Sequence, residues 1–309
     1  MQLVQPAPRW SQSTAEALRR ATGGRARILH DADTPALLAL AEAAPIANAF
    51  VASLVQSGRL AGPRGRGMPS LFVAVGEPDA GPGSRLEAVA WVGSNVVPLF
   101  CGAGRAASIG VLGTAIAALG RRFGSLYGPH EPVLAIEAEL RRRGHRPRCV
   151  REVQPLLSLT GATRCEGDPR VTQASPAQFD AVLAASAAMF EEELGVSPFR
   201  DAATSYIERV RRLIHDGRVL IRPDGLGVPV FKADIGTLSR QCAQLQGIWV
   251  RPDRRGEGIA AAATAAAVDY ARRLAPQVSL YVNDFNTAAL RTYARVGFER
   301  VGTFATVLY

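Results

Sequence analysis

The stretch WVRPDRRGEGIA, residues 249–260, decides the fold of this chain. Residues 244–250 before it have strand character, and residues 259–274 after it are almost continuous helix formers up to Pro276. Gly256 and Gly258 carry no Cβ, so the backbone can adopt a positive φ and approach an anion closely, while the free N–H groups of the helix start point at it. The stretch therefore predicts a strand, an anion-binding turn and a helix, with Arg254 and Arg255 adding positive charge.

A second pattern follows the predicted helix. Residues 278–282 read as a short strand, and residues 287–296 read as a helix that Gly297 closes. Asn286, Leu290 and Tyr293 recur at helical spacing in this segment. The thirty-one residues from Arg255 to Asn286 are the length that one helix, one loop and one strand require.

Together the two segments resemble the GNAT superfamily of acyl-CoA-dependent N-acyltransferases. The pyrophosphate motif of that family, Arg/Gln-x-x-Gly-x-Gly/Ala, is met by Arg255, Gly258 and Ala260. Its second motif, Asn-x-x-Ala-x-x-x-Tyr-x-x-x-Gly-Phe, is met by Asn286, Ala289, Tyr293, Gly297 and Phe298. The resemblance covers residues 171–309.

The two halves of the chain read as a repeat. A shift of 154 residues places residues 95–106 on residues 249–260 and Ser125-Leu126-Tyr127 on Ser279-Leu280-Tyr281. A period of this length indicates a duplicated domain and not a solenoid. We therefore expect an α/β (α+β) fold with two tandem GNAT-type domains, residues 1–163 and 164–309, joined by a turn-rich linker at residues 160–169. Each domain is expected to be a mixed, mainly antiparallel sheet with a splayed central strand pair flanked by helices.

The first half lacks the residues that carry the resemblance. Cys101, Val133 and Leu140 stand where Arg255, Asn286 and Tyr293 stand in the second half. Residues 102–107 also fit a GxGxxA dinucleotide fingerprint, but no acidic residue follows at the required distance. The first domain is therefore interpreted as a degenerate GNAT-like copy.

The resemblance implies direct attack of a neutral amine on the thioester of an acyl-CoA, acetyl-CoA being the usual donor. Tyr293 would protonate the departing thiolate, although a phenol on a helix can also be a core aromatic. The strand backbone at Ile248 and Val250 would pair with pantetheine and donate to the oxyanion. The residues implied in acetyl-CoA binding are Ile248, Trp249, Val250, Arg254, Arg255, Gly256, Glu257, Gly258, Ile259, Ala260 and Asn286.

The general base is left open by the sequence. Some family members carry a Glu five residues before the motif Asn, and here that position is Tyr281. The candidates are Asp284, Asp234, the acidic run of residues 191–193 and the terminal carboxylate of Tyr309, with a water chain as an equal alternative. Residues 191–193 also suggest a cationic amine as acceptor, while a solvated helix end explains them as well.

Composition excludes several other function classes. The net charge is +9, and Lys232 is the one lysine among 36 basic residues, a bias that resembles GC-rich coding. No nucleic-acid motif or interleaved aromatic residues accompany the arginines, so nucleic-acid binding is disfavoured. The four cysteines form no CxxC pair, which argues against a metal site. The chain has no signal-peptide core and no membrane-span-length apolar run, so we expect a cytoplasmic protein.

Two alternatives to an N-acetyltransferase use the same residues. A non-catalytic acyl-CoA-binding or regulatory protein would keep the loop at Arg255 and is favoured by Tyr281 at the Glu position. Aminoacyl transfer by a related double fold is disfavoured, because such chains do not normally retain the Arg-x-x-Gly-x-Ala loop. Neither the acceptor, the acyl-chain preference nor the oligomeric state has a signature in the sequence.

Overall fold

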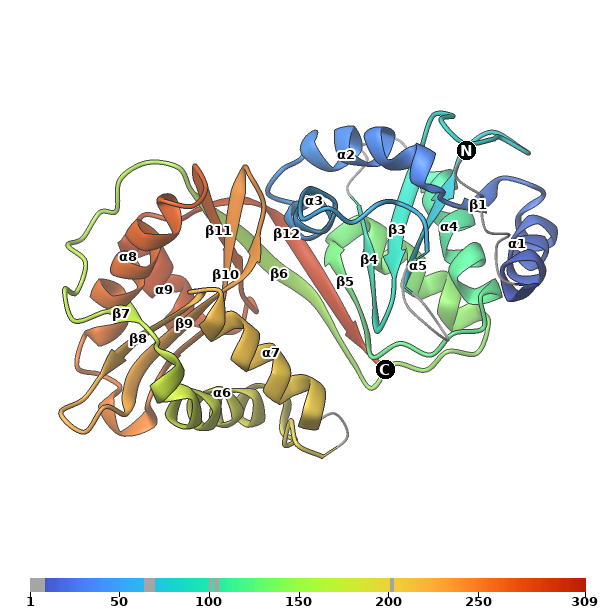
Figure 1. Ribbon diagram of the computed structural model, residues 1–309. Coiled ribbons are helices and arrows are strands. Elements are labelled where there is room, and N and C mark those ends of the chain that lie inside the picture. Colours follow the sequence, from blue (N-terminus) through green and yellow to red (C-terminus); the bar gives the residue numbers. More distant parts are fainter. Residues whose placement is uncertain (1–8, 64–69, 100–101, 103–105, 201–202) are drawn as a thin grey trace. The chain divides into compact units, whose positions relative to one another are not determined.

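The computed structural model describes residues 9–63, 70–99, 102, 106–200 and 203–309 (Figure 1). The chain divides into two compact units. Unit 1 consists of residues 1–155 and 302–309, and unit 2 consists of residues 156–301. This division differs from the predicted one at 163/164, because strand β6 (Cys149–Leu159) ends in unit 2 and strand β12 (Glu299–Leu308) ends in unit 1.

Unit 1 contains one sheet in the order β1-β2-β3-β4-β5-β12. Its neighbouring strands are antiparallel except for the parallel pair β4–β5. The strands are β1 (Ala26–Ile28), β2 (Leu71–Val75), β3 (Ala88–Val92), β4 (Asn95–Pro98) and β5 (Ser125–Pro129). The helices are α1 (Arg9–Thr22), α2 (Thr34–Glu42), α3 (Ala49–Gln56), α4 (Ala106–Ala118) and α5 (His130–Arg142).

Unit 2 repeats this plan in the order β6-β11-β10-β9-β8-β7, and β10–β11 is its parallel pair. The strands are β7 (Thr172–Gln173), β8 (Val219–Pro223), β9 (Pro229–Leu238), β10 (Cys242–Val250) and β11 (Gln277–Tyr281). The helices are α6 (Phe179–Leu194), α7 (Ala203–His215), α8 (Ile259–Arg272) and α9 (Thr287–Val296). The mixed, mainly antiparallel sheet predicted for each half is confirmed.

Alternating strand residues divide each sheet between two helix layers, as the period of two in a strand requires. In unit 2, Val219 and Ile221 pack with α6 and α7, whereas Leu220 packs with α8. In unit 1, Val73 and Ala90 pack with α4 and α5, whereas Phe72 and Val89 pack with α2 and α3 (Figure 1). Helices α2 and α3 therefore correspond to α6 and α7, and α4 and α5 correspond to α8 and α9.

The register of the parallel pairs refines the predicted repeat. Asn95 lies beside Ser125, and Gln244 lies beside Ser279. Ser125 Oγ donates to Asn95 Oδ1 at 2.8 Å, and Gln244 Nε2 donates to Ser279 Oγ at 3.3 Å, so the two pairs have the same side-chain contact. The shift of 154 holds for the two serines and for helices α4 and α8, but the sequence match of Asn95 with Trp249 is wrong. The equivalent of Asn95 in the sheet is Gln244, because β10 runs further than β4 beyond this pair, to Val250 against Pro98.

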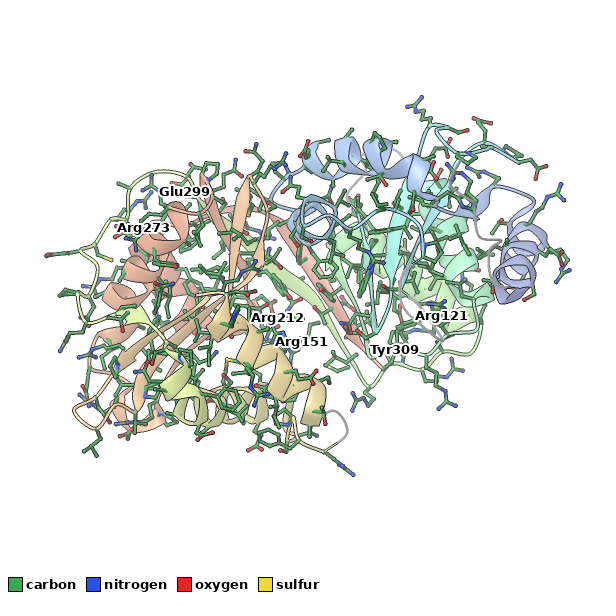
Figure 2. The ribbon with its side chains drawn as sticks, in the orientation of Figure 1. Arg121, Arg151, Arg212, Arg273, Glu299 and Tyr309 are labelled. Atoms are coloured by element: carbon green, nitrogen blue, oxygen red, sulfur yellow. The ribbon has the colours of Figure 1, made fainter. Side chains whose placement is uncertain are left out.

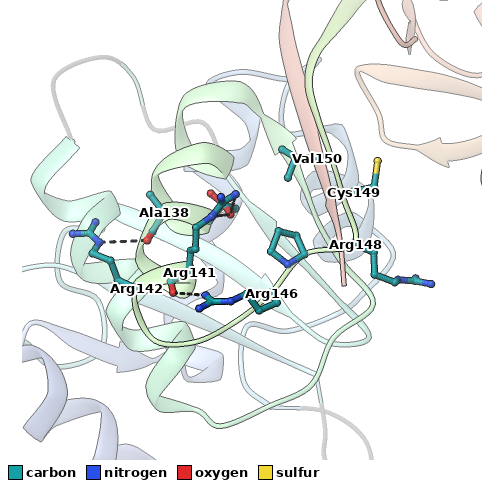
Figure 3. A pocket seen from close by; sticks show the side chains of 9 residues that line it. Ala138, Arg141, Arg142, Arg146, Arg148, Cys149 and Val150 are labelled. Atoms are coloured by element: carbon teal, nitrogen blue, oxygen red, sulfur yellow. Dashed lines mark hydrogen bonds and ion pairs between the residues drawn. The ribbon is translucent and has the colours of Figure 1, made fainter.

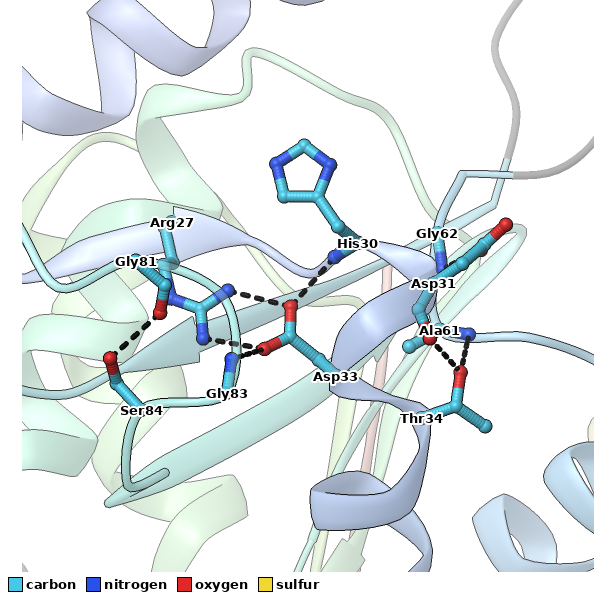
Figure 4. Close-up of polar contacts among 10 residues, drawn as sticks. All are labelled: Arg27, His30, Asp31, Asp33, Thr34, Ala61, Gly62, Gly81, Gly83 and Ser84. Carbon is cyan, nitrogen blue, oxygen red and sulfur yellow. Dashed lines mark hydrogen bonds and ion pairs between the residues drawn. The ribbon is translucent and has the colours of Figure 1, made fainter. Parts of the chain in front are cut away.

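A buried aspartate fixes the start of α2 in unit 1 (Figure 4). The Asp33 carboxylate accepts both guanidinium contacts of Arg27, at 2.7 and 2.8 Å, and the N–H groups of His30 and Gly83, each at 2.8 Å. Burial alone would raise the pKa of Asp33, but the hydrogen bonds from Arg27, Gly83 and His30 outweigh burial and lower it to about 2. Asp33 is therefore ionised in the folded state and holds three segments of unit 1 together.

Two sequence interpretations fall on residues that the structure leaves out. The Arg/Gly run at residues 64–67, whose composition predicts a flexible linker, lies outside the described residues, as do residues 103–105 of the GxGxxA match at residues 102–107. The turn-rich segment at residues 160–169 is described and contains neither helix nor strand.

Candidate functional site

The segment from β10 to α8 has the predicted strand, turn and helix. Residues 252–254 form one turn of 3-10 helix, and Gly256 and Gly258 have φ of +85° and +74°. A Cβ built on either glycine meets no atom within 4 Å, so the glycines are needed for their backbone conformation and the space in front of them is open. Gly258 is the N-cap of α8, whose first N–H groups have no acceptor within the helix. The turn can thus hold an anion such as a pyrophosphate.

Arg255 is held in place by a carboxylate of another helix. Its Nη1 and Nη2 donate to Glu192 Oε1 and Oε2, each at 2.7 Å, and its Nε donates to the carbonyl oxygen of Val250 at 3.0 Å. Glu192 lies in the last turn of α6 and also accepts from Trp249 Nε1 at 3.3 Å. The hydrogen bond from Arg255 lowers the pKa of Glu192, and the same bond raises the pKa of Arg255. A carboxylate therefore occupies the position at the guanidinium that a phosphate oxygen would take.

The neighbouring charges of the turn are paired with each other. Arg254 Nε and Nη2 donate to the two carboxylate oxygens of Glu257 at 2.7 and 2.8 Å. Ile259 is buried and anchors the first turn of α8 in the core, whereas Ala260 is half-buried. Because Glu257 and Glu192 engage both arginines, an incoming anion must compete with two ion pairs for these guanidinium groups.

Strands β10 and β11 separate after a short parallel stretch. Among the described residues they pair only through residues 242–244 and 277–279, and β10 continues to Val250 paired with β9. The N–H groups that β10 directs away from β9 beyond Gln244 are therefore not taken up by β11. This arrangement is the predicted splayed central pair. Ile248 and Val250, the two predicted backbone donors, lie in the part of β10 that is paired with β9 but not with β11.

Asn286 begins α9 by capping it. Its side-chain oxygen accepts from the N–H of Ala289 at 3.1 Å, and its Nδ2 group remains as the donor for a ligand. Asn286 itself is exposed, in the loop that follows β11. The motif residue therefore has one atom committed to the helix and one atom available for binding.

Tyr293 lies on the inner side of α9. It is 7% exposed and packs at 67° against the ring of Phe298, with 5.9 Å between ring centroids. Burial raises the pKa of Tyr293, and the negative charge of Glu193 raises it further. The phenol consequently stays protonated at neutral pH, which is the state a proton donor needs.

A buried ion pair lies on β9, the strand next to β10, on the face of the sheet that α6 and α7 cover. Lys232 Nζ donates to Asp234 Oδ2 at 2.8 Å, and the two residues are 1% and 6% exposed. Within the described residues, Asp234 Oδ1 is buried and has no hydrogen-bond partner. Such a group is costly to bury and therefore calls for an explanation.

The ion pair is next to a bulge in β10. Asp234 of β9 lies opposite Gln246 of β10, and Lys232 lies opposite Trp249. Between these two pairs, β10 has two residues where β9 has one, which is a β-bulge. Gly247, at φ +59°, is one of these two residues, and a Cβ on it would lie 2.9 Å from Asp234 Oδ2 and 3.1 Å from Lys232 Nζ. The glycine permits both the backbone conformation and the close approach of the two charged groups.

The other base candidates have different places in the structure. Asp284 is exposed in the loop before α9, and Glu192 is engaged by Arg255. Glu192 is thus committed to Arg255, the charge of Glu193 acts on Tyr293, and an acceptor site lined by residues 191–193 stays a prediction. Tyr309, labelled in Figure 2, belongs to unit 1, where its N–H donates to the carbonyl of Gly124 at 3.1 Å. A terminal oxygen of Tyr309 accepts from Arg148 Nε at 2.9 Å in the same unit.

The composition of the chain singles out Lys232 as its one lysine. In a chain that uses arginine at every other basic position, the single lysine lies 1% exposed in the centre of a sheet. A compact ammonium suits a narrow buried position better than a planar guanidinium does. The one lysine thus marks a buried polar site as well as a coding bias.

A large open depression lies in unit 1 (Figure 3). It has a volume of about 1000 Å³ and is lined by residues 137–138, 141–142 and 146–150. Its arginines are engaged within unit 1, for example Arg141 with Glu137 at 2.6 Å and Arg148 Nε with a terminal oxygen of Tyr309 at 2.9 Å. None of the predicted site residues lines it.

Within the part of the chain that the structure describes, no group of three or more His, Cys, Asp or Glu side chains could hold a metal ion. In the same residues, no helix has the length and apolar character needed to cross a membrane.

Comparison with known proteins gives two family matches. Residues 197–298 match the model of the Acetyltransferase (GNAT) family, and residues 79–182 match the model described as Domain of unknown function (DUF4081). A search of curated proteins finds no match.

Solved structures share the fold over almost the whole chain. A GNAT-family acetyltransferase from Colwellia psychrerythraea is 12% identical, with a TM-score of 0.58 over 92% of this chain and 99% of that one. A GCN5-related N-acetyltransferase from Sphaerobacter thermophilus is 18% identical, with a TM-score of 0.59 over 91% and 94%. A tandem GNAT protein from the clavulanic acid biosynthesis pathway is 15% identical, with a TM-score of 0.52 over 91% and 98%. At these identities the similarity concerns the fold alone.

Proposed function

We propose that this chain, whose residues 197–298 form a GNAT acetyltransferase domain, transfers the acetyl group of acetyl-CoA to a primary amine in unit 2. The observation that carries the proposal is the open, glycine-spaced start of α8 with Arg255 beside it, at the end of a strand that has parted from its neighbour. That geometry provides a pyrophosphate cradle next to unpaired backbone donors. Unit 1 takes no part in the chemistry.

Donor binding rests on the turn and on the separated strand. The N–H groups of residues 256–260 and the Arg255 guanidinium bind the pyrophosphate, with Glu192 released from Arg255 as the phosphate oxygens arrive. The Nδ2 group of Asn286 donates to an amide of the pantetheine. The unpaired N–H groups of β10 at Ile248 and Val250 bond the pantetheine and stabilise the oxyanion.

Acetyl transfer then needs a proton at the leaving sulfur. The amine nitrogen attacks the thioester carbon, the C–S bond breaks, and the Tyr293 hydroxyl protonates the thiolate. Its raised pKa keeps Tyr293 protonated until sulfur develops negative charge. Glu193 and the buried Asp234 add negative charge around this site, which favours an acceptor that arrives as a cation.

A pair of variants tests donor binding. Acetyl-CoA should raise the Tm of the wild-type protein and of Arg272→Ala, an exposed arginine at the end of α8 that serves as the control. Arg255→Ala should bind acetyl-CoA about 10 to 100 times more weakly, because it loses charge-assisted bonds to the pyrophosphate. Absence of any acetyl-CoA stabilisation of the wild type would refute the proposal.

Turnover separates the enzyme from its alternative. Release of the free thiol of CoA should be measured with amino acids, aminoglycosides, small alkylamines and peptide N-termini as acceptors. Acetyl-CoA binding without thiol release in any of these reactions would favour the non-catalytic acyl-CoA-binding protein.

A further inference from the structure

The buried pair of Lys232 and Asp234 is not required by the fold. Asn95 of unit 1 corresponds to Gln244 of unit 2, so Val97 corresponds to Gln246. The residue opposite Val97 is Trp91, and the residue opposite Gln246 is Asp234, so Trp91 stands at the place of Asp234. By the same register Val89 stands at the place of Lys232. Apolar residues thus fill these positions in a sheet of the same order, as buried ion pairs can often be replaced without loss of stability.

One atom of the pair has no role within the protein. Asp234 Oδ2 is satisfied by Lys232 Nζ, but Oδ1 is buried without a donor among the described residues. The side chain is 94% buried, since it is 6% exposed. A carboxylate oxygen in such a place is suited to a donor that comes from a ligand.

The surroundings of Asp234 are apolar and aromatic on the side of the helices. Met189 of α6 lies 3.3 Å from where a Cβ of Gly247 would be. Tyr206 of α7 packs edge-on against Phe190 and Phe199, with ring centroids 5.6 and 6.0 Å apart. Burial and, second, the charge of Asp234 raise the pKa of Tyr206 to about 12. An ammonium attached to an alkyl or aryl group matches this combination of one free carboxylate oxygen and apolar walls.

We propose that Asp234 is the residue that receives the acceptor amine, binding its ammonium through Oδ1 and accepting its first proton. This inference rests on the proposed function and names its missing general base. The bulge at Gly247 brings the carboxylate next to the unpaired part of β10, where the thioester is held. Lys232 Nζ donates to Asp234 Oδ2 at 2.8 Å and so fixes the orientation of the carboxylate, and Lys232 is therefore a positioning residue.

The proton balance of the step is complete. The ammonium loses one proton to Asp234 Oδ1, and the neutral nitrogen forms the N–C bond with the acetyl carbon. As the C–S bond breaks, the second N–H proton leaves to water and Tyr293 gives its proton to the sulfur. Tyr293 recovers a proton from water and Asp234 releases one to water, so each turnover releases one proton.

Asp234 interacts with a charged group on its own strand and with a titratable group on a helix. Lys232 of β9 donates to Asp234 Oδ2, and the charge of Asp234 acts on Tyr206 of α7, on which Arg209 of α7 and Glu193 of α6 also act. The strand neighbours on either side, Val219 of β8 and Gln246 of β10, carry no charge.

The test uses two probe amines with the full-length protein at saturating acetyl-CoA. Butylamine is an ammonium at neutral pH, whereas hydroxylamine is mostly neutral. In Asp234→Asn we expect butylamine acetylation to fall about 100-fold or more, because proton acceptance is lost. Hydroxylamine acetylation should fall much less, and the KM for acetyl-CoA should stay unchanged. Asp269→Asn, an exposed carboxylate on α8, is the matched control and should behave as the wild type.

A second variant guards against misfolding. Lys232→Val combined with Asp234→Leu replaces the pair by apolar residues, as at Val89 and Trp91. It should fold, bind acetyl-CoA as the wild type does, and fail to acetylate butylamine.

Each other outcome decides against the inference. A butylamine rate of Asp234→Asn within about threefold of the wild type, or an equal loss for both amines, would show that Asp234 accepts no proton. Wild-type protein that acetyl-CoA stabilises but that accelerates neither probe would overturn the assignment of a primary ammonium to Asp234. A wild type without acetyl-CoA stabilisation would instead remove the proposed function.

Discussion

Units 1 and 2 have the same strand order and the same parallel pair, but differ where the chemistry is proposed. In unit 1, Trp91 packs against Phe50 of α3 with 5.2 Å between ring centroids, and Phe50 packs in turn against Tyr127 at 6.2 Å. In unit 2 the corresponding strand position is Asp234. The bulge at Gly247 also has no counterpart in the register of β3 and β4. The fold therefore tolerates an aromatic core at this place, and the buried charges and the bulge of unit 2 serve another purpose.

The two units also differ at the second motif, where unit 1 has an isobutyl side chain and unit 2 has a phenol with its hydroxyl. Leu140 of α5 and Tyr293 of α9 are the paired residues of the repeat, and they are 0% and 7% exposed. Both belong to the core between sheet and helix. A leucine therefore satisfies the packing at this position of unit 1, and the core by itself does not require a phenol there.

The largest effect should come from removing that hydroxyl. Tyr293→Phe keeps the ring and its contact with Phe298, but removes the proton donor for the thiolate. We expect kcat to fall by about 10²- to 10⁴-fold, with the affinity for acetyl-CoA unchanged. Thiol-release kinetics and acetyl-CoA titration measure the two quantities.

Leu140→Met at the paired position of unit 1 is the control for this prediction, since it alters core packing alone and should leave kcat unchanged. A Tyr293→Phe protein with wild-type kcat would contradict the role of Tyr293 as the acid.

The next effect concerns stability in unit 1. Asp33→Asn should lower the free energy of unfolding by roughly 2 kcal/mol at neutral pH, the value that follows from a pKa lowered from 3.8 to about 2. Because the pKa of Asp33 is lower in the folded state, its contribution is fully present above the unfolded pKa near 3.8 and is lost as the pH falls towards 2. Denaturant unfolding at a series of pH values measures both.

The comparison between the units makes this prediction specific. Acetyl-CoA binding to unit 2 at neutral pH should be the same in Asp33→Asn and in the wild type, because the Asp33 cluster consists of unit 1 residues. Equal pH dependence of unfolding in both proteins would contradict the structural role of Asp33.

The smallest effect should come from Glu192→Gln. It removes the carboxylate that occupies Arg255, and the two side chains are 44% and 47% exposed, so their pairing is worth at most about 1 kcal/mol. Acetyl-CoA should consequently bind up to about fivefold more tightly. Isothermal titration measures the change, and Glu191→Gln is a suitable control on the same helix. Weaker binding in Glu192→Gln would mean that Glu192 positions Arg255 and does not compete for it.

The sequence predicted much of this structure because its signals are local. The glycines at 256 and 258 fix a turn that only a positive φ permits, and Gly297 closes α9 at φ +114°. The strand and helix order of both halves followed from such local signals. The interpretation of the first half as a degenerate copy rests on Cys101 and Leu140, single residues at fixed spacing.

The remaining features depend on contacts between distant segments. Glu192 meets Arg255 across 63 positions of the chain, and no spacing rule links a helix end to a turn so far away. Asp234 was one of several acidic candidates until the strand register showed it beside Lys232 and the bulge. The division at 163/164 failed for the same reason, because it assumed that each half supplies its own last strand.

The exchange of last strands affects how the protein folds during synthesis. Residues 304–308 of β12 pair with β5, whose residues 125–129 are made almost two hundred positions earlier. The sheet of unit 1 therefore waits with an open edge at β5 while all of unit 2 is translated, and contacts of such long sequence separation form slowly. Until residues 304–308 are made, the edge at β5 therefore lacks the strand that covers it in the folded protein.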